Sequence, residues 1–252
     1  MKYRLIASIA ALGAASIGSA QTAPSDVWKL NSGFVYTTGS YGLNTDTEVS
    51  IVPVGTTFDT NYWAFGASTS YLTINGPAAA VNGIEIIRPT ASSESGLGDT
   101  LLSGSWKVMN DPGKLHVSLT AKVKVPTADY DKGLGTGAFD YSAQVDLLEN
   151  IGTATPFASA GYRWLGSHGV YHLQDGAFAD AGAAFKVADG TSIGAFYECD
   201  AKVSQGSSAA SQATAFFFHK LNANWAANFF GIKGFSNASP DWGCGLSVIY
   251  TL

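Results

Sequence analysis

The sequence predicts an all-β fold, a transmembrane antiparallel up-and-down β-barrel of about twelve strands. Apolar and polar residues alternate without a break from Leu115 to Val125, which is typical of a strand between two different environments. Only 13% of the residues are charged, yet no apolar run of about 20 residues follows the first residues, which argues against membrane helices. Short and long connections alternate between the predicted strands, as periplasmic turns and extracellular loops do.

The strand from Leu115 to Val125 by itself leaves two interpretations open. Its length of about ten residues is enough to cross a bilayer at a tilt, with lipid on the apolar face and a lumen on the face of Lys122 and Lys124. A strand of a soluble sandwich would alternate in the same way. Aromatic residues at both ends of the predicted strands favour the barrel, because the two bilayer interfaces select such rings. They are Trp28, Trp63, Trp106 and Trp225 beside the short turns, and Tyr71, Tyr141, Trp164 and Trp242 at the other ends.

The first 20 residues have the pattern of a cleaved signal peptide. Lys2 and Arg4 precede an apolar segment at 5–17, and small residues at 18–20 offer a cleavage site. A short membrane anchor is the less favoured alternative, because polar residues follow directly. We therefore expect a signal peptide over residues 1–20 and a barrel over residues 21–252.

The other strands follow from the same alternation and from turn residues between them. Pro53 weakens the second strand, because it lacks a backbone donor. Cys199 and Cys244 fall on the apolar phase of separate strands, so we expect two small apolar side chains and no disulfide. The strands at 212–221 and 225–235 are aromatic on both phases, which leaves their facing open. The predicted strands besides 115–125 are 28–36, 47–58, 63–71, 101–108, 140–147, 158–164, 179–186, 193–203, 212–221, 225–235 and 242–252.

Charged residues of both signs collect on the phase that would face the lumen. Such groups must be paired or hydrated, because an isolated buried charge is costly. They either line a polar path and set its selectivity or fill the lumen with salt bridges. Lys124 beside Asp140, and Lys122 beside Ser142, are expected cross-strand neighbours. The candidate pore-lining residues are Lys107, Lys122, Lys124, Asp140, Asp146, Arg163, Asp180, Lys186, Glu198 and Asp200, and Asp99 shares their phase.

The connection at 76–88 is unusually apolar for an extracellular loop. It is a candidate gate through Val81, Ile84, Ile86 and Ile87. The favoured alternative is an extension of a strand hairpin above the membrane, because Ile84, Ile86 and Arg88 resume a period of two.

No residue pattern indicates catalysis, a cofactor or a metal. His116, His168, His172 and His219 lack a fixed spacing to a serine nucleophile or a carboxylate set, and His168 and His172 lack a third ligand. Without Lys2 and Arg4 the formal charge is −7, and no basic patch favours nucleic acid.

Four segments resemble one known family, the outer-membrane β-barrels named for the MetA pathway of phenol degradation and often called transporters. The segments are 96–99 (GLGD), 123–137 (VKVPTAD, then KGLGTG), 161–166 (GYRWLG) and 239–246 (SPDWGCGL). The resemblance implies the outer membrane of a Gram-negative bacterium and passage of small, often aromatic or apolar compounds. It also implies membrane lipid and the barrel assembly machinery as partners. Because the chain ends in Leu252 rather than an aromatic residue, we expect assembly to depend on Tyr250.

The sequence therefore predicts a passive channel or transporter for a small-molecule solute, aromatic or apolar in character. Two alternatives remain open. The first is a non-conducting barrel with a structural or surface-binding role, and the second is a barrel lipid hydrolase.

Overall fold

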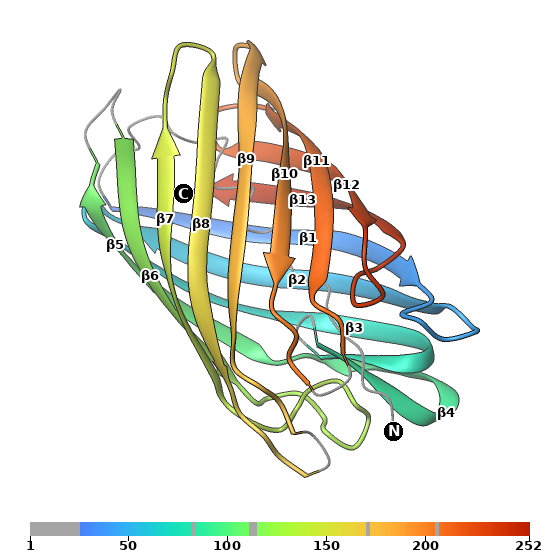
Figure 1. Ribbon diagram of the computed structural model, residues 1–252. Coiled ribbons are helices and arrows are strands. Elements are labelled where there is room, and N and C mark those ends of the chain that lie inside the picture. The colour runs from blue at the N-terminus through green and yellow to red at the C-terminus, as the bar shows by residue number, and fades with distance from the viewer. Residues whose placement is uncertain (1–25, 82–83, 111–114, 170–171, 205–206) are drawn as a thin grey trace.

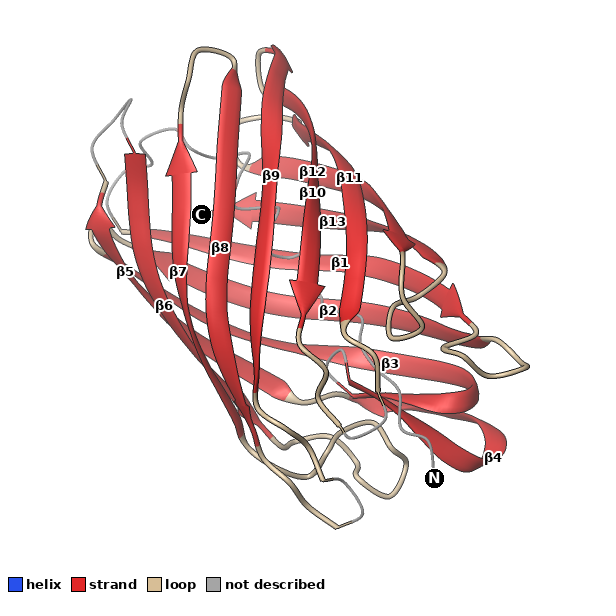
Figure 2. Ribbon diagram, in the orientation of Figure 1, coloured by secondary structure: helices blue, strands red, loops and turns tan. Residues whose placement is uncertain are grey.

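The structure is a computed structural model that describes residues 26–81, 84–110, 115–169, 172–204 and 207–252. The predicted signal peptide, residues 1–20, lies outside the described residues. All of the regular secondary structure in the described residues is β-strand (Figure 2). Among the same residues, no helix is long and apolar enough to span a membrane.

The described residues form thirteen strands. They are β1 (Val27–Gly39), β2 (Thr47–Asp59), β3 (Trp63–Val81), β4 (Ile84–Leu97), β5 (Thr100–Met109), β6 (Leu115–Val125), β7 (Asp140–Glu149), β8 (Ala154–Leu165), β9 (Gly176–Ala188), β10 (Thr191–Asp200), β11 (Ala210–Lys220), β12 (Trp225–Gly234) and β13 (Trp242–Thr251).

All thirteen strands belong to one antiparallel sheet that closes on itself (Figure 1). The ring closes through the pairings of β1 with β13 and of β2 with β3, while β4 pairs only with β3 among the described strands. β3 has two partners on one edge, because residues 63–68 pair with β5 and residues 71–81 pair with β4. β4 and β5 therefore share one position in the ring. The barrel has twelve strand positions, which confirms the predicted fold class.

β4 passes into β5 through a β-bulge. Leu97 pairs with Tyr71 while Leu101 pairs with Ser68, so one extra residue lies between the two pairings. One extra residue moves the following side chains to the other face of a sheet. Asp99 consequently lies on the inward face with Leu101, rather than on the outward face with Leu97.

The apolar segment after Asn75 forms a hairpin, as the second interpretation of that segment expected. Val81 at the end of β3 pairs with Ile84 at the start of β4. Pairing of β3 with β2 ends at Asn75, so the hairpin extends past β2 at the end of the barrel with the long connections (Figure 1). The prediction of a long connection was wrong for β4. A register shift between Gly76 and Ala78 interrupts the alternation from which a strand is recognised.

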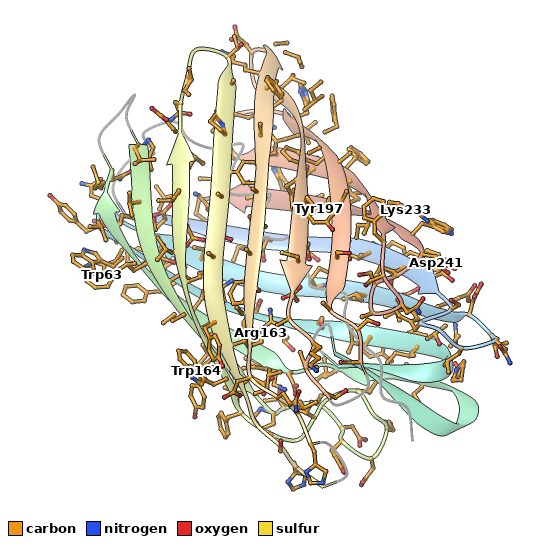
Figure 3. The ribbon with its side chains drawn as sticks, in the orientation of Figure 1. Trp63, Arg163, Trp164, Tyr197, Lys233 and Asp241 are labelled. Carbon is orange, nitrogen blue, oxygen red and sulfur yellow. The ribbon has the colours of Figure 1, made fainter. Side chains whose placement is uncertain are left out.

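The outer face carries a ring of aromatic side chains at each end. The eight tryptophans and tyrosines predicted there are each between 43% and 51% exposed. Trp63 stacks on Trp106 with ring centroids 6.1 Å apart, and Trp63 and Trp164 project outward from the barrel (Figure 3). Exposed rings at two levels are what a bilayer selects, and the predicted arrangement is confirmed.

The facing of β11 and β12, which the sequence left open, follows from burial. Phe216, Phe218 and Phe230 are buried on the inward face, whereas Phe217 and Phe229 are exposed on the outward face. The barrel interior therefore receives aromatic rings on this side.

The cysteine and proline expectations also have clear outcomes. Cys199 and Cys244 are free and exposed on the outward face, which confirms the prediction for them.

Pro53 lies within β2, where the Ser32 hydroxyl donates to the Pro53 carbonyl at 3.0 Å. Pairing of β1 with β2 skips Val52 and Pro53, consistent with the missing N–H of Pro53.

Candidate functional site

The inward faces of the strands divide the lumen into a charged wall and an apolar wall. The predicted pore-lining residues all lie on β5 to β10. The buried apolar residues come from β1 to β3 and β9 to β12, with Leu134 added from a loop. That apolar cluster contains Val35, Val49, Ile51, Leu72, Ile74, Leu134, Ala184, Phe196, Phe216, Phe230 and Ile232.

Lys124 is the centre of a buried ion cluster on the charged wall. Its Nζ lies 2.7 Å from Asp140 Oδ2 and 3.2 Å from Asp99 Oδ2, and the side chain is only 4% exposed. The register also pairs Lys124 with Asp140, and Lys122 with Ser142, as the sequence predicted. Because a buried charge needs close partners, these three charged residues stabilise one another.

The loop at 126–139, between β6 and β7, folds inward at the end of the barrel with the long connections. Leu134 is 1% exposed and packs in the apolar cluster, while Thr136 is 0% exposed and accepts a 2.6 Å hydrogen bond from Lys124. The backbone N–H of Ala128 donates to Asp99 Oδ1 at 3.0 Å. The ion cluster therefore holds this loop in the mouth of the lumen. The sequence predicted only a connection between the strands at 115–125 and 140–147, and the inward position of the loop was not expected.

A second ion cluster lies at the other end of the barrel, beside the short turns. Lys29 Nζ lies 3.1 Å from Asp59 Oδ2, and Lys107 Nζ forms an ion pair with Asp59 Oδ1. Lys107 also donates to the carbonyl of Thr60 at 2.7 Å. Only Lys107 of this cluster was among the predicted pore-lining residues. Asp59 was assigned to a turn, and Lys29 was overlooked although it alternates with the outward Trp28 and Leu30.

Arg163 joins the charged wall to an aromatic ring. Its Nη2 lies 3.3 Å from Asp200 Oδ1, and its guanidinium lies over the Phe178 ring, 5.1 Å from the centroid. Arg163 lies one residue before the outward Trp164 (Figure 3). A small recess is lined by Arg163, Leu165, Gly176, Ala177, Asp200, Ala201 and Val203.

Three further predicted pore-lining residues have different surroundings. Gln212 donates a 2.9 Å hydrogen bond to Glu198 Oε1. The hydroxyl of Thr120 donates to Asp146 at 2.7 Å. Lys186 is exposed beside the short turn after β9 and lies 2.7 Å from Asp189, whose pKa is lowered by the hydrogen bond from Lys186. Lys186 therefore stands apart from the groups deeper in the lumen.

Phenylalanine rings of the apolar wall lie across glycines of the neighbouring strand. Phe216 is directly opposite Gly194, and Phe230 is directly opposite Gly245. A Cβ added at Gly194 would lie 2.4 Å from Phe216 Cζ, and one at Gly245 would lie 2.3 Å from Phe230 Cζ. The rings therefore extend along the wall instead of across the lumen. Phe196 continues this aromatic surface, with its ring centroid 6.4 Å from that of Phe216.

Three of the four histidines contact neighbouring polar or aromatic side chains. His116 and His219 lie 2.9 Å from Asn110 Oδ1 and Thr191 Oγ1, respectively. His168 packs edge-on against Tyr130. In the part of the chain that the structure describes, no three or more His, Cys, Asp or Glu side chains are grouped to hold a metal.

A closed barrel with aromatic rings at both ends and a two-sided lumen defines the class of outer-membrane β-barrels. The chain belongs to the family described as "Putative MetA-pathway of phenol degradation", which it matches over residues 18–252. This confirms the resemblance found in the sequence. No curated protein matches the chain.

Solved structures with the same fold include two channels and a porin. The COG4313 outer membrane channel from Pseudomonas putida F1 has 12% identity and a TM-score of 0.72, covering 93% of this chain and 98% of its own. The NanC porin has 10% identity and a TM-score of 0.57, covering 88% and 100%. The CymD monoaromatic hydrocarbon channel has 8% identity and a TM-score of 0.50, covering 100% and 94%. At these identities the likeness concerns the fold.

Proposed function

We propose that this barrel is a passive outer-membrane channel for small aromatic or apolar solutes. The observation that carries the proposal is the two-sided lumen. Aromatic rings laid along one wall offer an apolar solute a contact surface, while the charged wall keeps water in the path. The shared fold with the COG4313 outer membrane channel and with CymD, named as a monoaromatic hydrocarbon channel, supports it.

The charged wall would act as a selectivity lining at positions where charges face water. The ion cluster at Lys124 is buried, which supports the second interpretation, a lumen filled by salt bridges, at that position. Lys122 lies on the same inward face and has no ion pair among the described residues. We therefore propose that both interpretations of the predicted charges apply, at different positions.

Single-channel recording in a planar bilayer tests the proposal. For the protein purified from outer membranes we expect discrete current steps, and brief interruptions when toluene is added. Absence of steps from protein that shows heat-modifiable migration on a gel would contradict a channel. A structural or surface-binding role would then replace it.

Neutralising Lys122 should change ion selectivity. For Lys122→Gln we expect the reversal potential in a salt gradient to shift toward cation preference by about twofold in permeability ratio, because about 0.4 kcal/mol of lost attraction for anions suffices. Lys132→Gln is the matched control, since Lys132 is half exposed on a loop and pairs with Asp129 at 3.8 Å. An unchanged reversal potential in Lys122→Gln would remove Lys122 from the conducting path.

The proposal includes no catalytic activity. Phospholipid hydrolysis by the purified barrel that disappears in His116→Ala or His219→Ala would contradict it and favour a lipid hydrolase. The proposed partners are outer-membrane lipid, the barrel assembly machinery and the solute, with no nucleic acid. Assembly is proposed to depend on Tyr250, whose ring lies on β13 with its centroid 4.7 Å from that of Trp225.

A further inference from the structure

Two polar side chains are buried side by side in the apolar wall without hydrogen-bond partners among the described residues. Asn228 on β12 is 0% exposed, and neither its Nδ2 nor its Oδ1 has a partner. Ser247 on β13 is 4% exposed, and its Oγ has none. The register places Asn228 directly opposite Ser247. Three unpaired polar atoms therefore belong to one cross-strand pair on the inward face.

Aromatic residues surround this pair. Phe218 lies directly opposite Asn228 on its other side, and Phe230 is the next inward residue along β12. Gly245, the next inward residue from Ser247, leaves the space that the Phe230 ring occupies. The amide and the hydroxyl are thus two polar groups buried within the otherwise apolar wall.

The chemistry of the pair matches a hydroxyl group. Buried polar groups in folded proteins are nearly always paired, because desolvation without a hydrogen bond is unfavourable. Exceptions are expected at functional sites, where a ligand supplies the missing partner. The Asn228 amide offers a donor and an acceptor, and the Ser247 hydroxyl can act as either. A hydroxyl both donates and accepts, so it can bond to both residues, whereas a hydrocarbon would leave them unpaired.

We propose that Asn228 and Ser247 form a hydrogen-bonding subsite for the hydroxyl of a ring-containing apolar solute. Phe218 and Phe230, which are 5% and 6% exposed, must rotate to admit the ring. The ring then packs against them while the hydroxyl bonds to the Asn228 amide and to Ser247. The inference rests on the proposed function and narrows it. Among solutes of equal size, the channel retains the one that carries a hydroxyl.

Binding of two matched probes tests the subsite. 4-Fluorophenol and 4-fluorotoluene differ in one hydroxyl against one methyl, and both are followed by ¹⁹F NMR titration of the full barrel in detergent, with detergent alone as the blank. We expect the wild-type protein to bind 4-fluorophenol about tenfold more tightly than 4-fluorotoluene. Asn228→Leu should abolish this preference. Ser247→Ala, a smaller change, should reduce it and serves if Asn228→Leu does not fold.

Asn31→Leu is the matched control. Asn31 is an inward-facing asparagine on the neighbouring β1, and its Oδ1 is also buried and unpaired. That oxygen leans toward β2, away from the pair, because it lies 2.5 Å from where a Cβ of Gly55 would be. The preference for 4-fluorophenol should therefore remain in Asn31→Leu.

Three results would overturn the subsite. Equal affinity of the wild type for the two probes would remove the subsite and leave the channel in place. An unchanged preference in folded Asn228→Leu or Ser247→Ala would assign the hydroxyl to another position. Binding of neither probe to the wild type would remove the apolar solute path, and the subsite with it.

Discussion

Replacing Lys124 with methionine should open the mouth of the barrel and destabilise the protein. Lys124 Nζ lies between the buried carboxylates of Asp99 and Asp140 and donates to Thr136 in the inward loop. Removing one partner of a buried ion pair costs about 3–5 kcal/mol, because the remaining charge stays unpaired. We expect the loop at 126–139 to leave the lumen. Single-channel conductance should rise severalfold, and the urea midpoint of unfolding should fall.

The control for this prediction is Lys132→Met in the same loop. Lys132 pairs with Asp129 at 3.8 Å and both side chains are about half exposed, so the free energy of unfolding should change by only about 0–1 kcal/mol. Adding Asp140→Asn to Lys124→Met should recover part of the stability, because one unpaired carboxylate is removed. Wild-type conductance and urea midpoint in Lys124→Met would show that Lys124 does not hold the loop.

Alternation along single strands made most of the fold predictable from the sequence. The lipid-facing residues of Leu115–Val125 and the lysines on its other face follow directly from a period of two. The pairing of Lys124 with Asp140 was predictable as well, because β7 follows β6 in the chain and up-and-down barrels pair consecutive strands.

Features that depend on register or on a loop's path were not predictable in the same way. The bulge before β5 and the register shift after Gly76 change the alternation at one residue, so β4 was taken for a connection. In the inward loop, Leu134 lies between Gly133 and Gly135. A glycine-rich segment of this kind is typical of a flexible loop, so its packing inside the lumen was not predictable from the sequence. Which phenylalanine meets which glycine depends on the register of β12 against β13, and the aromatic residues on both phases of β12 concealed its inward face.

Replacing Gly245 with alanine should narrow the lumen through Phe230. The new Cβ would lie 2.3 Å from Phe230 Cζ, and its three nearest heavy atoms would all belong to that ring. The ring must therefore turn away from the wall and into the lumen. Overpacking of this kind costs about 1–3 kcal/mol. We expect a clear loss of conductance and of the current interruptions caused by toluene, measured in single-channel recordings.

Two further variants separate a narrowed lumen from a general defect. Gly231→Ala places a methyl group on the outward face of β12, where the nearest heavy atom is Gly243 O at 4.0 Å, so conductance should be unchanged. Phe230→Leu added to Gly245→Ala removes the displaced ring and should restore conductance toward the wild-type value. If the double variant conducts no better than Gly245→Ala, the loss does not act through Phe230. The glycine would then matter for the backbone of β13 and not for the width of the lumen.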